Sequence, residues 1–540
     1  MKTIGLLNSS LADQPLFDWL SKAFAVRFEE RHDRKSDALD AWIMTGFDPA
    51  ARQAIESTSL PSLLYQSRNA TEKEKGAVRL SFCGTGLVPA VFRGREVEQN
   101  NLGVLSRLGL AESDAVLASV SADPVWIARQ AGGRRIDTVA MSLPPVDASQ
   151  ILFDHFQAVN FARLLPLVDF LRRITEEAQW QKPCRPACFM FDDLNLHAAG
   201  YGWLDYTELS RHAARHNYHV SFATVPLDAW YDSRQAVALL AKPQSRLSLL
   251  IHGNDHISRE LATYPSEEVA IRSLAQGLRR VAALEKRTGA QVARVMAAPH
   301  SACTEEVFHV MARLAYEAGC FGHGSLRRYN RQKSWTQSLG AGICTMIGGF
   351  PVLPRFRFTP LGRNAVLLAA YLDQPIIPYG LHQDVSGGLG LLDDLADFIN
   401  SLGDVRWMDM RGVARANFQT RCQNGVLHLR PFPRVFKVQV PPDMDKVAFD
   451  CQVYSPATGW QVLLRAPRQP DKTFFVQNGE PFSVPPGSEL EVKVMDPNEI
   501  DANLVPAPKP QFYPIIRRHL CEARDRIAPA IPVLGRRLFG

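Results

Sequence analysis

The sequence has no long hydrophobic run, no cysteine framework and no concentrated positive charge. Its apolar stretches fall short of the roughly 18 residues that a membrane-spanning helix needs, so we expect no such helix. The nine cysteines lack zinc-finger spacing, and their odd number fits a reduced setting better than a disulfide scaffold. A net charge of +6 over 540 residues, scattered rather than gathered in a basic and aromatic stripe, predicts no nucleic-acid partner.

Two local signals are also missing from the N-terminal region. The apolar stretch in Met1–Ser10 is too short for the core of a signal peptide, and no small-residue cleavage pattern follows it. We therefore expect a cytoplasmic protein. A Gly-x-Gly-x-x-Gly fingerprint is missing from the early connections as well, so dinucleotide binding is not predicted.

The composition indicates a large globular protein of several domains. With 46% hydrophobic and 21% charged residues, the chain can bury extensive cores and should form about three or four domains of ~150 residues each. The predicted divisions are an α/β accessory domain at 1–150, a helical connector at 151–184, an α/β barrel at 185–414, a β-sandwich-like domain at 415–498 and a basic amphipathic tail at 499–540.

The predicted accessory domain begins with three strand-like runs, Thr3–Leu7, Ala41–Thr45 and Ser62–Tyr65. Helix-like stretches separate them, which indicates a small parallel sheet of Rossmann-like type. The later run Ala115–Ser119 resembles a segment of glutamine-amidotransferase-like domains. Because Cys83 has no His and Glu partners downstream, we expect a scaffold or substrate-docking role here rather than catalysis.

Strands and helices alternate regularly through the region 185–414, which favours an α/β barrel. The predicted strands are Ala187–Phe191, His219–Val225, Leu247–Ile251, Ala293–Ala298, Val366–Tyr371, Ile376–Leu381 and Val405–Met408. Predicted helices are Asp205–His216, Glu267–Arg287 with Ser266 as N-cap, a helix that Thr304 caps and that stops at Gly319, and Leu391–Ser401.

Chemically distinctive residues follow two of the short apolar runs in this region. Asp192 and Asp193 come directly after the run Ala187–Phe191, and His252 and His256 follow the run Leu247–Ile251. The carboxyl ends of barrel strands form the face where chemistry is done. One Asp and two His supply the donors of an open, three-ligand divalent-metal site.

These motifs carry a family resemblance that covers about 185–412. They are Phe191-Asp192-Asp193, His252-x-x-x-His256, a strand ending at Pro299, and Leu381-His382. Together they resemble the polysaccharide deacetylase superfamily, which includes the NodB-homology domains of carbohydrate esterase family 4. The resemblance implies a distorted (β/α) barrel.

The resemblance also implies a role for each matched residue. Asp193, His252 and His256 bind a divalent metal, for which Zn²⁺ is the first expectation and Co²⁺ or Ni²⁺ the alternatives. Asp192 is the general base and His382 the general acid. Both roles suit their chemistry, because adjacent strand residues point to opposite sides and the pKa of histidine lies near neutrality.

Four more residues near the motifs are candidate substrate contacts: Asn195, Tyr201, Pro299 and His300. For His300, an extra metal ligand and simple loop packing remain alternatives. The chain departs from the family pattern at Gly253, where a Ser or Thr is usual, and around Pro299, where an Arg is usual.

The same His spacing occurs at His212 and His216. This pair falls in a predicted surface helix, where we expect both side chains simply to lie on the helix face without binding a metal. The pair therefore serves as an internal control for the metal site.

The C-terminal region changes to short alternating runs punctuated by turns, which predicts the β-sandwich. Its role is either carbohydrate binding or packing against the barrel. Residues 511–540 carry six Arg with interleaved apolar residues, a pattern typical of peripheral membrane contact or of a docking tail. Pro514, Pro529 and Pro532 are expected to interrupt any long helix there.

The residues and the resemblance together predict a metal-dependent deacetylase in the cytoplasm, with association to a membrane as an alternative. It would remove an N-acetyl group from an acetamido sugar, or a sugar-linked intermediate, in polysaccharide or glycolipid biosynthesis. One alternative keeps the chemistry on a non-sugar amide or ester. The other is a catalytically inactive barrel that binds a glycan or a partner.

Overall fold

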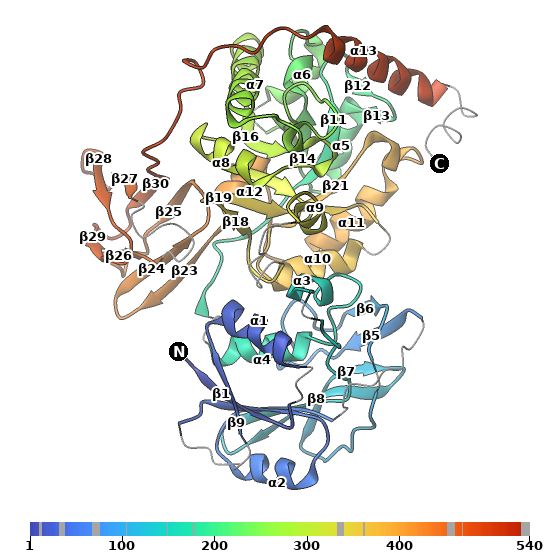
Figure 1. The fold of residues 1–540 in the computed structure, drawn as a ribbon, viewed down its shortest axis with the longest axis vertical. Helices are drawn as coiled ribbons and strands as arrows, with labels where there is room; N and C mark the ends of the chain where they lie inside the picture. Colours follow the sequence, from blue (N-terminus) through green and yellow to red (C-terminus); the bar gives the residue numbers. More distant parts are fainter. Residues whose placement is uncertain are drawn as a thin grey trace. The chain divides into compact units, whose positions relative to one another are not determined.

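The computed structural model of the protein describes residues 1–9, 13–31, 38–66, 76–103, 105–147, 149–175, 179–242, 244–331, 340–359, 362–450, 459–466 and 468–530. The chain divides into two compact units (Figure 1). Unit 1 comprises 1–180, 334–342 and 360–372, and unit 2 comprises 181–333, 343–359 and 373–540. The first crossing from unit 1 to unit 2 therefore falls directly after Trp180.

Unit 1 contains a nine-stranded mixed sheet in the order β2-β1-β3-β4-β9-β8-β7-β5-β6. Its strands are β1 (Thr3–Leu7), β2 (Arg27–Glu30), β3 (Ala41–Thr45), β4 (Ser62–Tyr65), β5 (Val78–Phe82), β6 (Glu96–Gln99), β7 (Asp114–Val120), β8 (Asp123–Ala131) and β9 (Arg134–Val139). The three strands predicted from the sequence have the predicted bounds and pair in parallel. The antiparallel half, from β9 to β6, was not predicted, although Gly132–Gly133 at the tip of the β8–β9 hairpin is a common two-residue turn signal.

The helices of unit 1 are α1 (Gln14–Phe24), α2 (Pro49–Ser57), α3 (Leu152–His155), α4 (Leu165–Ile174) and α10 (Gly362–Tyr371). The strand predicted at Val366–Tyr371 is wrong, because this segment is the second half of α10. Every residue of the segment is buried, so it shows no periodicity that separates a helix from a strand.

Unit 2 is built on a second nine-stranded sheet, in the order β18-β19-β17-β16-β15-β14-β11-β21-β20. Its strands are β11 (Phe189–Leu194), β14 (Val220–Thr224), β15 (Leu247–Ile251), β16 (Val292–Ala297), β17 (Ala318–Phe321), β18 (Thr345–Ile347), β19 (Phe350–Pro354), β20 (Phe356–Arg357) and β21 (Pro378–Gly380). All neighbours pair in parallel except β18 with β19. The strand predicted at Val405–Met408 is β22 (Val405–Trp407), which pairs with β10 (Arg185–Ala187) in a separate two-stranded sheet.

The two end regions of this sheet are connected by a single residue. Strand β19 lies next to one edge and β20 forms the other, and only Arg355 separates them in the sequence. One residue spans at most ~3.6 Å, so the sheet must curve until its end regions lie close together.

The helices of unit 2 are α5 (Tyr206–Arg215), α6 (Arg234–Leu240), α7 (Glu267–Thr288), α8 (Glu305–Arg313), α9 (His323–Tyr329), α11 (Gly390–Asn400), α12 (Met410–Arg415) and α13 (Phe512–Ile527). Helix α7 begins as predicted, with the Ser266 hydroxyl accepting from the Val269 N–H. The helix predicted to stop at Gly319 ends earlier, at Arg313, because the chain reverses at Ala315 (φ 58°) and Gly319 pairs within β17. Within the described ranges, no helix is long and apolar enough to cross a bilayer.

The region after residue 415, for which the sequence predicts a β-sandwich, forms two four-stranded sheets in unit 2, β23-β24-β26-β29 and β25-β30-β27-β28. The strands are β23 (Phe418–Gln423), β24 (Val426–Pro431), β25 (Val435–Gln439), β26 (Lys446–Phe449), β27 (Trp460–Arg465), β28 (Lys472–Val476), β29 (Phe482–Ser483) and β30 (Glu489–Val494). Phe436, Phe449 and Trp460 lie at the centre of its core.

Candidate metal centre

The chemistry-bearing residues of unit 2 follow neighbouring parallel strands. Strands β21, β11, β14, β15 and β16 are consecutive in the sheet. Asp193 is the last residue but one of β11, and the segments after β21, β15 and β16 carry His382, His252 and His300. Carboxyl ends of parallel strands meet at the same edge of a sheet. The topology therefore places these four segments at one edge.

A β-bulge sets the direction of Asp193. The pairing of β11 with β14 shifts register between Asp192 and Leu194, which leaves Asp193 as the extra residue. Its φ of 72° is a left-handed conformation that a residue with a side chain rarely adopts. Such a bulge re-aims a side chain, at a local strain of roughly 1–3 kcal/mol.

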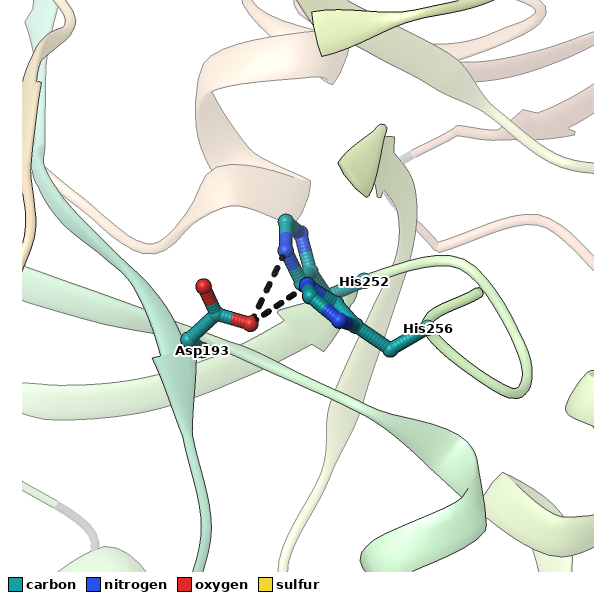
Figure 2. A group of neighbouring side chains, drawn as sticks. All are labelled: Asp193, His252 and His256. Carbon is teal, nitrogen blue, oxygen red and sulfur yellow. Dashed lines mark ion pairs between the residues drawn. The ribbon is translucent and has the colours of Figure 1, made fainter. Parts of the chain in front are cut away.

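Asp193, His252 and His256 converge on one point (Figure 2). Asp193 Oδ1 lies 2.6 Å from His256 Nε2 and 3.5 Å from His252 Nε2. The oxygen is buried, yet it accepts no hydrogen bond of normal geometry. One carboxylate oxygen and two imidazole nitrogens, close together but not aligned for hydrogen bonding, are a donor set that fits a divalent metal ion.

The electrostatics of the cluster keep Asp193 ionised. Burial by itself raises the pKa of this carboxyl, but the His256 and His252 rings outweigh burial and hold it well below its ordinary value. A deprotonated carboxylate is the form that ligates a metal.

His252 is held in the tautomer that metal binding needs. Its Nδ1 lies 2.8 Å from the carbonyl oxygen of Ala297, which can only accept, so Nδ1 carries the proton. Nε2, which faces Asp193, is therefore left with a free lone pair. A backbone carbonyl in this position is a common outer partner of a ligating histidine.

Glu260 fixes the loop between the two histidines. Its buried carboxylate accepts the backbone N–H groups of Asn254, Asp255 and His256 at 2.9–3.1 Å, and the Tyr264 hydroxyl at 3.1 Å. Four donors on one carboxylate hold the loop in a single conformation, and with it the separation of His252 and His256.

Gly253 is explained by the same loop. Its φ is 65°, and an added Cβ would lie 2.5 Å from Glu260 Oε2 and 2.7 Å from Pro299 Cγ. The Ser or Thr that the resemblance leads one to expect at this position would collide with both groups. The loop geometry thus accounts for the glycine found there.

The other acidic residue of the pair, Asp192, is bound by a residue that the sequence did not indicate. Arg355, which is buried, donates from Nη1 to Asp192 Oδ1 at 2.9 Å and from Nη2 to Ser301 Oγ at 3.0 Å. Its guanidinium carbon also lies 4.0 Å from the centre of the Tyr379 ring. The segment around Pro299 lacks an arginine. The guanidinium that contacts Asp192 and Ser301 comes instead from Arg355, between β19 and β20.

His382 lies in an aromatic pocket beside this cluster's edge of the sheet. Its ring stacks on Trp203 at 5.3 Å between centroids, and Tyr201 packs edge-on at 5.2 Å. Asp525 Oδ2 is 3.6 Å from its Nε2, and neither ring nitrogen has a hydrogen bond. The buried imidazole of His382 therefore has both ring nitrogens without a hydrogen bond. Its ring contacts are with Trp203 and Tyr201 and its charged neighbour is Asp525, none of which belongs to the Asp193 cluster.

The four candidate substrate contacts have different surroundings. Tyr201, in the hairpin of β12 (Gly200–Tyr201) and β13 (Leu204–Asp205), donates to Asp525 at 2.9 Å. Asn195 is buried and accepts the backbone N–H of His197 at 3.2 Å. Pro299 lies against Gly253, and the exposed ring of His300 is 5.6 Å from the ring of His256.

Helix α13 brings residues to the site that the sequence did not indicate. Arg517 donates to the carbonyl oxygen of His256, and Arg518 lies 3.5 Å from Asp193 Oδ1. The predicted interruption is wrong for Pro514, which lies in the first turn of the helix, where no N–H is needed. The α-helix ends at Ile527, two residues before Pro529, in line with the prediction for that proline. Pro532 lies outside the described residues.

The control pair His212 and His216 also gathers a carboxylate. Their Nε2 atoms lie 2.6 Å and 3.7 Å from Asp393 Oδ1 on α11. The described residues therefore hold two His-His-Asp groups, of which only the first stands at the carboxyl ends of the strands.

A cavity of 490 Å³ adjoins the loop between His252 and His256. Its lining includes Asp255 and Glu260 from the loop, Arg280 from α7 and Lys509 from the segment before α13.

No family model and no curated protein matches the sequence. Among solved structures, the carbohydrate deacetylase Agd3 is similar at 8% sequence identity and a TM-score of 0.47, over 78% of this chain and 90% of that chain. A family 4 carbohydrate esterase from Streptomyces lividans is similar at 8% identity and a TM-score of 0.25, over 43% and 94%. A CE4 esterase from Streptococcus mutans is similar at 12% identity and a TM-score of 0.24, over 42% and 87%. The chain thus has structural likenesses to such deacetylases and esterases, at low sequence identity.

Proposed function

We propose that the protein is a metal-dependent hydrolase that removes an N-acetyl group from an acetamido sugar. The observation that carries this proposal is a pair of adjacent carboxylates with different partners at one edge of a parallel sheet. Asp193 groups with two histidines in a donor set that suits a metal, and Asp192 forms an ion pair with Arg355. In this arrangement one carboxylate serves as a metal ligand and the other is left to act as the base.

Asp193, His252 and His256 would hold the ion, with Zn²⁺ as the first expectation and Co²⁺ or Ni²⁺ as alternatives for the same donors. When bound, such an ion polarises a carbonyl and lowers the pKa of water from 15.7 toward roughly 7. The residues around the donors do the positioning. Ala297 sets the His252 tautomer, and Glu260 fixes the loop.

Asp192 accepts the proton of the attacking water. Its contact with Arg355 orients one carboxylate oxygen, which leaves the other for the water. His382 then donates a proton to the leaving nitrogen as the bond to the acetyl carbon breaks. Asp525 Oδ2, 3.6 Å from His382 Nε2, is the carboxylate that faces this ring nitrogen.

The substrate class follows from the setting that the sequence predicts. We propose an acetylated sugar in a nucleotide-linked or lipid-linked form, used in polysaccharide or glycolipid biosynthesis in the cytoplasm. Asn195, Tyr201, Pro299 and His300 are the proposed contacts to it, with the stacked ring of Trp203 as a further apolar surface.

Two features favour a second candidate, a catalytically inactive barrel that binds a glycan or a partner. Arg518 lies 3.5 Å from Asp193, and Arg517 contacts His256, so cationic groups already reach the donor set. A site used only for binding would tolerate that arrangement. A panel of acetylated sugars, non-sugar amides and esters separates this candidate, and a non-sugar hydrolase, from the first.

The test begins with bound metal, measured by elemental mass spectrometry on the purified wild-type chain. His252→Ala removes a proposed ligand, and His212→Ala is the matched control from the other His-His-Asp group. We expect near-stoichiometric metal that is lost in His252→Ala and kept in His212→Ala. A wild type that stays empty after addition of zinc, cobalt or nickel contradicts the proposal.

A second variant separates binding from chemistry. Asp192→Asn should keep the metal and lose acetate release by about 10²–10⁴-fold, which is the usual contribution of a general base. Unchanged acetate release in this variant would remove Asp192 from the mechanism while leaving the metal site in place.

A further inference from the structure

Charged residues on one face of helix α13 attach it to the rest of unit 2. Arg518 is buried and pairs with Asp228, with Nε 3.1 Å from Oδ2. Glu522 lies 2.8 Å from His197 Nδ1, and Asp525 accepts from Tyr201. These ion pairs and hydrogen bonds fix the rotation of the helix about its own axis, because residues 518, 522 and 525 share one face.

The opposite face of α13 is apolar and exposed to solvent. Its exposed fractions are 78% for Phe512, 67% for Tyr513, 59% for Ile516, 67% for Leu520 and 53% for Ile527. An ordinary surface helix has the reverse arrangement, with apolar residues toward the core. The polar contacts hold the apolar stripe outward, so the helix cannot bury it by rolling.

Two aromatic residues outside the helix extend this apolar surface. The ring of Trp230 lies 5.9 Å from the ring of His519 on α13, and Tyr231 lies 5.7 Å from Trp230. Both are exposed, at 62% and 51%. Trp and Tyr rings are enriched where a protein meets the boundary between lipid and water.

The charges on α13 that reach solvent are positive. The side chains of Arg524 and Arg526 are 48% and 32% exposed, whereas those of Glu522 and Asp525 are 14% and 6% exposed. Lys509, just before the helix, is exposed as well. A helix with an apolar stripe and a basic rim is complementary to an anionic lipid surface.

We propose that α13, together with Trp230 and Tyr231, docks the protein on an anionic lipid surface. The charge of the rim selects this occupant over a second copy of the chain, which would present the same positive charge. Because the inner face of α13 contacts Asp193 and His256, docking brings the candidate metal centre to the membrane. This last step rests on the proposed function and specifies its substrate as a lipid-linked acetamido sugar.

The docking test is flotation of the full-length protein with vesicles of phosphatidylcholine and phosphatidylglycerol, against vesicles of phosphatidylcholine alone. The double variant Ile516→Glu with Leu520→Glu replaces two exposed side chains, so the fold should persist. Phe475→Glu is the matched control, since Phe475 on β28 is 66% exposed. We expect salt-sensitive binding to the anionic vesicles that falls about tenfold or more in the double variant and persists in the control.

Three outcomes overturn the proposal. The wild type does not float with anionic vesicles, or the double variant floats equally well. In the third, the wild type forms a concentration-dependent dimer that the double variant loses, without vesicle binding, which makes a second copy the occupant.

The substrate step has its own readout. The double variant should keep acetate release from a water-soluble acetamido sugar and lose it about tenfold from the same sugar on a lipid anchor in anionic vesicles. Equal rates on both substrates overturn the lipid-linked class alone. Flotation without bound metal in the wild type would instead contradict the proposed function and leave docking standing.

Discussion

At the scale of single residues, Gly253 is where one added carbon should have a large effect. Gly253→Ala and Gly289→Ala both place a side chain at positive φ, 65° and 74°, which costs about 1–2 kcal/mol. Nothing lies within 4 Å of the added carbon at Gly289, whereas at Gly253 it meets Glu260 and Pro299. We expect Gly253→Ala to lose a further ~1–3 kcal/mol of unfolding free energy in urea titrations, and to bind zinc more weakly. Equal losses in the two variants would contradict this account of the loop.

Arg355 offers a second residue-scale prediction. Arg355→Ala leaves the buried Asp192 carboxylate without its partner, and breaking such a pair costs about 3–5 kcal/mol. The double variant Arg355→Ala with Asp192→Asn should cost less than the sum of the two single changes, because it removes the uncompensated charge as well. A double-mutant cycle in denaturant measures the coupling, and additive costs would mean that the ion pair is not formed.

At the scale of the element, the attachment of α13 should depend on pH through His197. Its two ring nitrogens lie 2.8 Å from Glu522 Oε2 and 2.9 Å from the Asp228 carbonyl oxygen. Both partners only accept when Glu522 is ionised, so both nitrogens must donate and the ring must be protonated. Arg526 shares Glu522, and Trp230 and Tyr231 pack against the ring.

The direction of this pH dependence follows from the pKa shifts of His197 and Glu522. Burial lowers the pKa of His197, but Glu522 and Asp228 outweigh it and raise the value above 6.5, so the contact weakens as pH rises through the raised value. Burial raises the pKa of Glu522, but His197 and Arg526 outweigh it and lower the value to about 2, so the contact persists until strong acid. We expect α13 to be held best between pH 4.5 and 6.5. Hydrogen exchange of α13, corrected for intrinsic rates, should show less protection at higher pH, and His197→Gln should flatten the profile.

The contact of α13 with His256 gives a further prediction for this element. Arg517 Nη1 lies 3.2 Å from His256 Nδ1, and a guanidinium only donates, so the ring proton sits on Nε2. Nε2 is the atom that faces Asp193, and its proton must leave before a metal binds. Arg517→Met should therefore bind zinc about tenfold more tightly by competition with a chelator. Arg524→Met, on the same helix, is the control, and an unchanged affinity for Arg517→Met would mean that this contact does not set the tautomer.

At the scale of the whole molecule, the two units should unfold separately. Unit 1 and unit 2 each have their own nine-stranded sheet, and the candidate metal centre lies entirely in unit 2. A ligand stabilises only the part that binds it, by about 2.7 kcal/mol at a hundred times its Kd. Zinc should therefore raise one of two calorimetric transitions and leave the other in place. A single transition that shifts as a whole would show that the units unfold as one.

Much of this arrangement could be predicted from sequence patterns alone. Short apolar runs marked β11 and β15, and parallel strands bring their carboxyl ends to one edge, so Asp193, His252 and His256 were expected to meet there. The alternating runs after residue 415 likewise marked the short strands of two four-stranded sheets. Continuous apolar segments carried no such information, which is why α10 was predicted as a strand.

The sequence by itself determined which residues follow the strand ends, because local periodicity and turn residues decide where strands begin and end. Only the tertiary structure decided their partners. Arg355 reaches Asp192 across 163 residues, and Arg517 reaches His256 across 261. A lone arginine has no local pattern that reveals a contact so distant in sequence. The outward direction of the apolar face of α13 was decided in the same way, because ion pairs with Asp228 and His197 outweigh the usual preference of an amphipathic helix.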